Sequence, residues 1–255
     1  MPDVYAAITE AEPAVVERLA DVLELRAGDP QQRSLRQAYL SRLTLAENRR
    51  LQVVGLDPSS TMLERARILS AGIANLDFRD GDARALPFQA AEFDVVLYHT
   101  TLCHIPGPET ALAEAHRVLR PGGQLAIFDA DYSTTSVATG PGDPLQGCAE
   151  AAVAAIVHDP HIVRRLASLV RRAGFEVRHF SSHAYDGVLD PTYLLTIVDR
   201  GAEALVKDGR IGAELGTALR AEARRRAAAG EFFGHIAYAS LIGVRQEAKN
   251  RGTIE

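Results

Sequence analysis

Acidic residues end two consecutive apolar segments of the sequence. Asp57 closes the segment LQVVGLD at residues 51–57, and Asp82 lies in the next one, NLDFRDGDA, at residues 75–83. In an open parallel sheet, ligands bind outside the carboxyl ends of the strands. A carboxylate at position 57 can accept both hydroxyls of a ribose. Asp82 can accept from the exocyclic amine of adenine, and the N–H of Ala83 can reach a ring nitrogen. The two strand ends together predict an adenosine site.

The elements that must position these residues alternate between strand and helix from residue 51 onward. Short apolar runs predict strands at 51–57, 75–83, 93–102, 124–131, 174–182 and 235–246, and the segments between them have helical periodicity. This alternation predicts an α/β fold with a doubly wound, mostly parallel sheet and helices on both faces. In residues 1–48 the apolar positions recur at helical spacing, which predicts an N-terminal helical cap. Residues 49–255 then form the α/β domain, with a helical insertion at about 190–230 and a long binding loop or lid at 132–160.

A longer motif follows Asp82. Residues 81–105 read GDARALPFQAAEFDVVLYHTTLCHI, and residues 112–129 read LAEAHRVLRPGGQLAIFD. This stretch resembles the class I S-adenosylmethionine-dependent methyltransferases, which share a Rossmann-like fold, and within them the small-molecule type that includes the quinone-biosynthesis enzymes. The resemblance extends over residues 51–130 and more loosely over the later strands.

The resemblance implies a set of cofactor contacts. Asp57, with the adjoining Pro58, matches the acid that holds the ribose of S-adenosylmethionine, and Asp82 and Ala83 match the adenine contacts. His99 and Thr100, at the end of the next strand, match the stretch that lines the methionine and substrate side.

The first motif of that family is missing. The family carries an early strand with roughly E-x-G-x-G-x-G, whose glycines let the backbone approach the cofactor. Here LTLAENRR runs directly into LQVVGLD, and Gly28 is the one glycine before Gly55. A βα unit of roughly 20–30 residues is therefore absent from the pattern.

Three explanations are open. The deletion is real; or the printed chain omits a segment that the molecule has; or the fold has slipped. In a slip, residues 51–57 take the central strand position and Asp82 inherits the ribose role, which avoids unpaired backbone groups inside the sheet. Neither the deletion nor the slip supplies a glycine loop, so we expect poor cofactor affinity from both.

Histidines at the mouth of the predicted sheet are the candidate catalytic residues. Methyl transfer needs the nucleophile in line with the methyl group, and a hydroxyl substrate gains from a general base. His99 and His104 flank the segment TTLC, so either is a candidate base. Substrate contacts are expected from later strand ends, namely Tyr132, His183, Tyr185, Phe233 and His235. No cluster has metal-ligand spacing, and no metal is expected.

Composition and charge limit the classes of partner that the protein is expected to have. A net charge of -5 and a pI near 5.9 argue against a nucleic-acid-binding surface. Two cysteines make no disulfide framework, no signal peptide is recognised, and no apolar run reaches the roughly 20 residues that span a bilayer. We expect a cytoplasmic protein without a membrane partner. The alanine- and arginine-rich C-terminal half is typical of a bacterial protein, and a homodimer is one oligomeric state that the sequence allows.

These observations predict S-adenosylmethionine-dependent methyl transfer to a small organic molecule. The alternative is a methyltransferase-like protein that has lost the cofactor loop. Such a protein would act as a binding protein for a small apolar ligand, as a cofactor-independent cyclase, or as a pseudoenzyme subunit beside an active partner.

Overall fold

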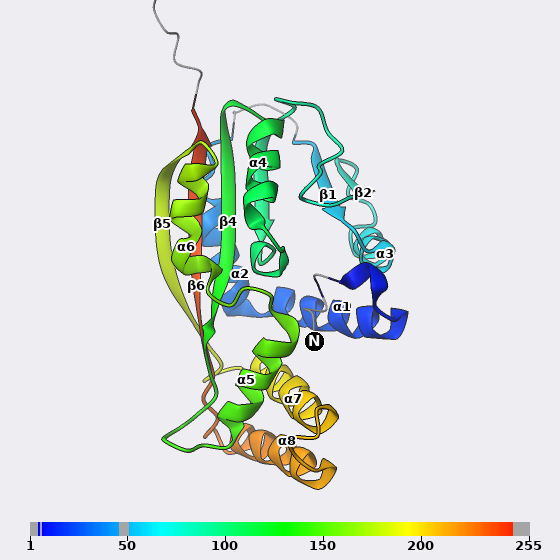
Figure 1. The fold of residues 1–255 in the computed structure, drawn as a ribbon, viewed down its shortest axis with the longest axis vertical. Coiled ribbons are helices and arrows are strands. Elements are labelled where there is room, and N and C mark those ends of the chain that lie inside the picture. The colour runs from blue at the N-terminus through cyan, green and yellow to red at the C-terminus, as the bar shows by residue number, and fades with distance from the viewer. Residues whose placement is uncertain (1–4, 6, 46–50, 247–255) are drawn as a thin grey trace, which may run out of the picture.

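The computed structural model describes residue 5 and residues 7–45 and 51–246 (Figure 1). The α-helices are α1 (Pro13–Gly28), α2 (Pro30–Leu40), α3 (Ser60–Leu69), α4 (Pro108–Val118), α5 (Leu145–Ile156), α6 (Ile162–Arg172), α7 (Thr192–Lys207) and α8 (Ala213–Ala228). The strands are β1 (Val53–Asp57), β2 (Leu76–Asp80), β3 (Phe93–His99), β4 (Leu119–Ser136), β5 (Phe175–Asp186) and β6 (His235–Arg245). Short 3-10 helices occur at η1 (Ile8–Glu10) and η2 (Leu102–His104).

Local sequence signals set the helix starts. The Asp29 carboxylate accepts from the N–H of Gln32 at 2.8 Å and caps α2, in which Pro30 occupies the first turn. Ser59 accepts from the N–H of Met62 at 3.3 Å and caps α3. The predicted division between helical cap and α/β domain, at residues 48 and 49, lies outside the described residues and stays a prediction.

The strands form two sheets. In the larger sheet the order is β3-β4-β6-β5, with β3 parallel to β4 and β6 antiparallel to both β4 and β5. Strands β3, β4 and β5 therefore run in one direction, and β6 runs against them. In the smaller sheet β1 is parallel to β2, from the pair Val53 and Leu76 to the pair Asp57 and Asp80. The predicted α/β fold with mostly parallel strands is confirmed.

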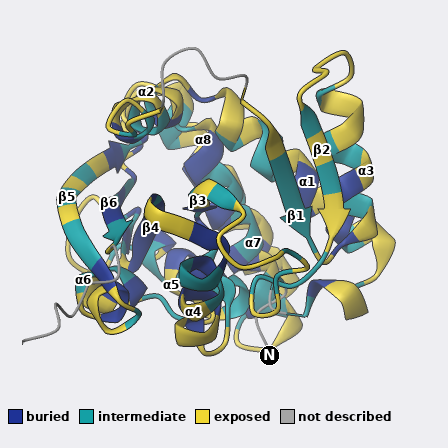
Figure 2. Cartoon of the chain, turned by 90° about the horizontal axis from the view of Figure 1, so that it is seen from above, coloured by how far each residue is buried: buried dark blue, intermediate teal, exposed yellow. Residues whose placement is uncertain are grey.

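The sheet is interrupted between β1 and β3. Among the described strands, β1 pairs only with β2, and β3 only with β4. Figures 1 and 2 show β1 on the side of its sheet that faces the larger one, without a described strand between them. Val53 is 47% exposed and Leu97 is 44% exposed, as expected of strands without a neighbour. The predicted absence of a βα unit is thus visible as an interruption of the sheet.

The slip hypothesis is wrong, because β1 does not pair with β3. Helices hold the smaller sheet in place instead. Helix α1 contacts both α3 and α7. On α3, the guanidinium of Arg65 pairs with three acids of α1, at 2.8 Å from Asp21, at 3.3 Å from Glu17, and also with Glu24. These acids lie on one face of α1, so α1 bridges the two parts of the molecule.

The core is concentrated in the larger sheet. The residues of β4 from Leu125 to Phe128 are fully buried, whereas neither β1 nor β2 contains a buried residue. The predicted insertion at about 190–230 forms α7 and α8. The expectation of a long loop over residues 132–160 is wrong: β4 continues to Ser136, and α5 occupies half of the remaining residues. The glycines and prolines of the segment are concentrated in residues 140–144, between β4 and α5, so they limit the loop to the stretch between these two elements.

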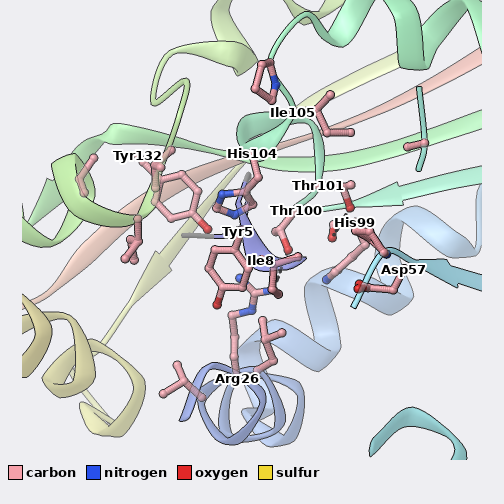
Figure 3. Close-up of a pocket in the computed structure, with 18 of the residues that line it drawn as sticks. Tyr5, Ile8, Arg26, Asp57, His99, Thr100, Thr101, His104, Ile105 and Tyr132 are labelled. Carbon is pink, nitrogen blue, oxygen red and sulfur yellow. Dashed lines mark hydrogen bonds between the residues drawn. The ribbon is translucent and has the colours of Figure 1, made fainter. Parts of the chain in front are cut away.

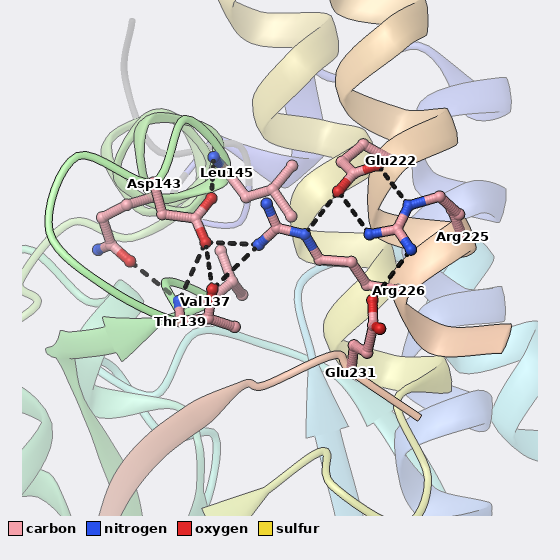
Figure 4. Close-up of polar contacts among 9 residues, drawn as sticks. Val137, Thr139, Asp143, Leu145, Glu222, Arg225, Arg226 and Glu231 are labelled. Atoms are coloured by element: carbon pink, nitrogen blue, oxygen red, sulfur yellow. Dashed lines mark hydrogen bonds and ion pairs between the residues drawn. The ribbon is translucent and has the colours of Figure 1, made fainter. Parts of the chain in front are cut away.

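A buried ion pair ties the remaining loop, residues 137–144, to α8 (Figure 4). The Asp143 carboxylate lies 2.5 Å from the Arg226 guanidinium, and their side chains are 4% and 14% exposed. It also accepts from the N–H groups of Thr139 and Leu145, at 3.0 and 3.1 Å. Burial alone would raise the pKa of Asp143, but Arg226 and these donors lower it below its usual 3.8.

Replacing Asp143 by Asn should lower the free energy of unfolding by about 2 kcal/mol, the range for hydrogen bonds to charged groups. Because the folded pKa is depressed, the contribution is present above the unfolded pKa of 3.8 and is lost as the pH falls below it. Denaturant unfolding at pH 7 and pH 3 measures both effects. Arg120→Gln is the control, since the pair of Arg120 with Asp94 is 46% and 64% exposed. Equal effects of the two substitutions at pH 7 would contradict the assignment.

Candidate functional site

A cavity of about 380 Å³ opens where the strands of both sheets end (Figure 3). This volume lies within the range of about 300–1,000 Å³ typical of small-molecule sites. Helices α1, α5 and α7 complete its walls. Its lining includes polar and apolar groups, among them Tyr5, Arg26, Asp57, Pro58, Asp82, Ala83, His99, Thr100, His104, Tyr132, Val153, Ile156, Tyr193, Ile197 and Arg200.

All six residues predicted to contact the cofactor line this one cavity. At one end, Asp57 accepts from the N–H of Ser59 at 2.8 Å through Oδ1, and no described residue donates to its Oδ2. Burial raises the pKa of Asp57, and the nearby charge of Asp80 adds to the rise. A half-buried carboxylate oxygen is therefore available to a ligand hydroxyl.

Asp82 is in a different environment. Both of its carboxylate oxygens accept from the Arg84 side chain, at 2.6 to 3.0 Å, and Oδ1 also accepts from the Arg84 N–H at 2.7 Å. These bonds lower the pKa of Asp82. The following Ala83 N–H has no acceptor among the described residues and lies at the cavity wall. A ring nitrogen could use that donor, while an amine would have to share Asp82 with Arg84.

The segment after Ala83 is attached to α4. The N–H of Leu86 donates to Glu114 at 2.8 Å, and the Arg117 guanidinium donates to the carbonyls of Leu86 and Phe88 at 3.0 and 2.8 Å. Since α4 precedes β4 directly, this attachment fixes the strand end of β2 relative to the larger sheet.

His99 is part of an aromatic stack. Its ring lies 5.0 Å from Phe128 at an interplanar angle of 13°, and the Tyr39 hydroxyl lies 2.8 Å from Nδ1. Burial lowers the pKa of His99 to about 3, with Arg26 and Arg36 adding to the effect. Burial also raises the pKa of Tyr39. The phenol is then the donor to Nδ1, which places the ring proton on Nε2.

His104 is the last residue of η2 and also lines the cavity. Its ring centroid lies 4.5 Å from that of Tyr5. The fully buried Asp129 interacts with its charge, and that carboxylate also accepts from the N–H groups of Cys103 and Ala130 at 3.2 and 2.9 Å. Burial raises the pKa of Asp129, and the charge of His104 opposes this rise.

Thr100 has strained backbone geometry at the cavity wall. Its φ of 49° lies in the left-handed region, which β-branched residues rarely adopt. Its N–H donates to the Phe128 carbonyl at 2.6 Å, and Arg26 Nη2 donates to its Oγ1 at 2.6 Å. Such strain costs on the order of 1–3 kcal/mol and persists where the surroundings fix the conformation, most often at functional sites.

The lining residues that were not predicted from the sequence include two tyrosines and two arginines, Tyr5, Tyr193, Arg26 and Arg200. Figure 3 shows the Arg26 side chain extending from α1 toward Tyr5, with Thr100 close by. One signal could have indicated Arg26. It follows Val22 by four residues and so lies on the inward face of an amphipathic helix, where a charge is unusual.

Among the predicted substrate contacts, Tyr132 lines the cavity, and four residues do not. His183 Nε2 lies 2.8 Å from Ser240 Oγ, and the buried Tyr185 hydroxyl donates to Asp29 at 3.0 Å. Phe233 is 38% exposed, and His235 begins β6. The described residues contain no helix long and apolar enough to cross a bilayer, and no group of His, Cys, Asp and Glu that could hold a metal ion.

Comparison with solved structures defines the fold class. A protein of Bacillus halodurans described as a methyltransferase aligns with a TM-score of 0.52 and 19% identity, covering 77% of this chain and 84% of that one. A phosphoethanolamine N-methyltransferase 2 of Haemonchus contortus, solved with phosphomonomethylethanolamine and S-adenosylhomocysteine, aligns with a TM-score of 0.51 and 15% identity, over 89% of this chain and 57% of that one. The chain has the Rossmann-like fold of the class I methyltransferases.

Sequence comparison finds relatives of part of the chain. Residues 37–127 match the family described as Methyltransferase domain. A demethylmenaquinone methyltransferase of Lactococcus lactis is 38% identical over 88 residues, 34% of this chain and 35% of that protein. The 27-O-demethylrifamycin SV methyltransferase of Amycolatopsis mediterranei is 35% identical over 130 residues, 50% of this chain and 48% of that protein.

Residues 37–127 thus resemble a methyltransferase domain, and the resemblance to small-molecule class I methyltransferases is confirmed. The aligned chain spans about a third to a half of the length of these curated relatives.

The environment of His99 predicts that it stays neutral in the folded protein down to about pH 3. Its NMR ring resonance, assigned with a His99→Gln variant, should therefore not move between pH 8 and 5. Because the unfolded chain takes up this proton near pH 6.5, His99 should also lower stability progressively as the pH falls from 6.5 toward 3. A His99 resonance that titrates near 6.5 would contradict the described packing.

Proposed function

We propose that this protein transfers the methyl group of S-adenosylmethionine to a small organic molecule. The observation that carries the proposal is the convergence of Asp57, Ala83 and Thr100 on one cavity that also receives His104. The methyltransferase domain and the fold support it. The predictions of a cytoplasmic location, a bacterial source and a homodimer rest on sequence alone and stay predictions.

The residues fit the adenosine part of the cofactor. Asp57 offers a free carboxylate oxygen to ribose hydroxyls, and Ala83 offers an N–H to the base. The methionine part lacks a glycine cradle. Gly81 lines the cavity, but a Cβ added there would meet the side chains of Leu56 and Pro87, at 2.8 and 3.4 Å, rather than a ligand space. Charged and hydroxyl groups from Arg26 and Thr100 lie at that end instead, so we expect weaker binding than a complete glycine loop provides.

When bound, S-adenosylmethionine supplies an electrophilic methyl group on a positively charged sulfur. The chain's own residues then have three tasks. Asp57 and Ala83 bind and orient the adenosine part of the cofactor, and the walls formed by Tyr132 and α5 exclude water from the cavity. His104 accepts the proton of the substrate's nucleophile, and Asp129 stabilises the resulting imidazolium. His99 is a weak base because of its lowered pKa, and its role is to shape the wall.

Calorimetric titration with S-adenosylhomocysteine tests the cofactor site. We expect saturable binding in the micromolar range to a protein whose intact mass is 27.5 kDa. Asp57→Asn should weaken it by about tenfold or more, because a charge-assisted hydrogen bond to ribose is lost. Asp94→Asn is the matched control: Asp94 pairs with Arg120 outside the cavity and is 64% exposed. Absence of heat up to millimolar ligand would reject the proposal.

His104 and His99 form a matched pair for the catalytic step. With an acceptor found by following S-adenosylhomocysteine release from a panel of phenols and organic acids, His104→Gln should lower kcat by about 10²-fold or more. It should also remove the dependence of kcat on the base's ionisation, while S-adenosylhomocysteine affinity stays unchanged. His99→Gln should preserve the pH profile. The reverse pattern would assign the base to His99.

One observation favours the alternative of a methyltransferase-like protein without methyl transfer: the sheet is interrupted where the glycine motif would enter. In that case the same cavity binds a small apolar ligand, or promotes a cofactor-independent reaction. The titration distinguishes the two, because this alternative requires ligand binding without affinity for S-adenosylhomocysteine.

A further inference from the structure

Two arginines enter the cavity from different helices. Arg26 extends from α1 and Arg200 from α7, and both line the cavity. Neither forms an ion pair with a carboxylate of the described residues, in contrast to Arg84, which lines the same cavity and is paired with Asp82. Two like charges in a cavity repel each other and lose hydration, so an anion between them would be stabilised.

The two guanidinium groups converge on one phenol. Tyr5 is hydrogen-bonded to Arg200, and its ionisation is influenced by the charges of both Arg200 and Arg26. Burial raises the pKa of Tyr5 and of Tyr132, so both phenols keep their protons. The wall near the arginines therefore consists of hydrogen-bond donors, which is the arrangement that recognises a carboxylate.

The surfaces beside these donors are apolar. Helix α5 contributes Ala152, Val153 and Ile156, Val157 follows directly after it, and α7 contributes Ile197. A small hydrophilic anion would leave these walls uncovered, whereas an acid with an aromatic or aliphatic body would cover them. The combination selects for an amphiphilic anion.

We infer that the acceptor substrate is an organic carboxylic acid with an apolar body, whose carboxylate lies between Arg26 and Arg200. This inference rests on the proposed function, since it concerns the same cavity. A carboxylate also occurs in the methionine part of the cofactor. Arg26 contacts Thr100, on the predicted cofactor side, whereas Arg200 lies on α7 and is hydrogen-bonded to Tyr5. Substitution of Arg200 therefore distinguishes a carboxylate of the acceptor substrate from the carboxylate of the cofactor.

The test compares 2-naphthoate with its uncharged analogue 2-naphthamide by calorimetry, on the protein as it stands. The acid should bind at least about tenfold more tightly than the amide, a difference of about 1.4 kcal/mol. Arg200→Gln should abolish this preference, and Arg200→Lys should restore part of it. Arg210→Gln is the matched control on an exposed arginine outside the cavity and should leave the preference intact. Thermal unfolding confirms that each variant is folded.

A parallel titration with S-adenosylhomocysteine separates this inference from the proposed function. Unchanged S-adenosylhomocysteine affinity in Arg200→Gln, with loss of the naphthoate preference, supports the substrate assignment. If the protein prefers naphthoate to naphthamide but does not bind S-adenosylhomocysteine, the carboxylate site is supported and the methyltransferase proposal is rejected. Equal binding of acid and amide to the unsubstituted protein would overturn the inference. It would also be overturned if Arg200→Gln weakened S-adenosylhomocysteine and left naphthoate unchanged, because the arginine would then hold the cofactor's carboxylate.

Discussion

Backbone hydrogen bonding at the centre of the sheet is the constraint on which the rest of the structure depends. A strand between two parallel neighbours satisfies the N–H and C=O groups of both. Here β1 and β3 each have a described partner on one side only. The smaller sheet consequently adds little to the core, and its attachment falls to side chains. Arg65 on α3 forms ion pairs with acids of α1. Helix α1 in turn contacts α7, and α7 packs against α5, which contacts β4 of the larger sheet.

The same interruption changes how the ligand site is built. In a glycine-loop site, backbone N–H groups approach the ligand directly. In this protein α1 supplies a long side chain, Arg26, that reaches across to Thr100 at the end of β3. The strained backbone of Thr100 is held by that contact and by β4. The helix that joins the two sheets therefore also furnishes a wall of the cavity, so that the integrity of the site depends on how firmly α1 is held.

The residues that could be predicted from the sequence are those fixed by local position at strand ends. Asp57, Asp82, His99 and Tyr132 each follow an apolar run, and parallel strands bring such ends together. Position alone did not distinguish Asp57, which has a free carboxylate oxygen, from Asp82, whose two oxygens both accept from Arg84. It also placed His183 and Tyr185 in the substrate site, because the strand was predicted to end at residue 182, whereas β5 continues to Asp186. The strand order β3-β4-β6-β5 puts β5 at the far edge of the sheet, where His183 contacts Ser240 and Tyr185 contacts Asp29 instead. Arg200 and Tyr5 were not predictable, because only the packing of α7 and the N-terminal segment around the cavity brings them together.

Hydrogen exchange with and without S-adenosylhomocysteine tests most directly whether the two sheets hold one ligand site. Peptides that report on residues 53–58 and 80–84 represent the smaller sheet, and peptides over 98–104 represent the larger one. The account predicts that saturating ligand slows exchange in both groups together, because one molecule would contact both walls. Slower exchange in only one group, or in neither, would contradict the claim that the interrupted sheet retains a single shared site.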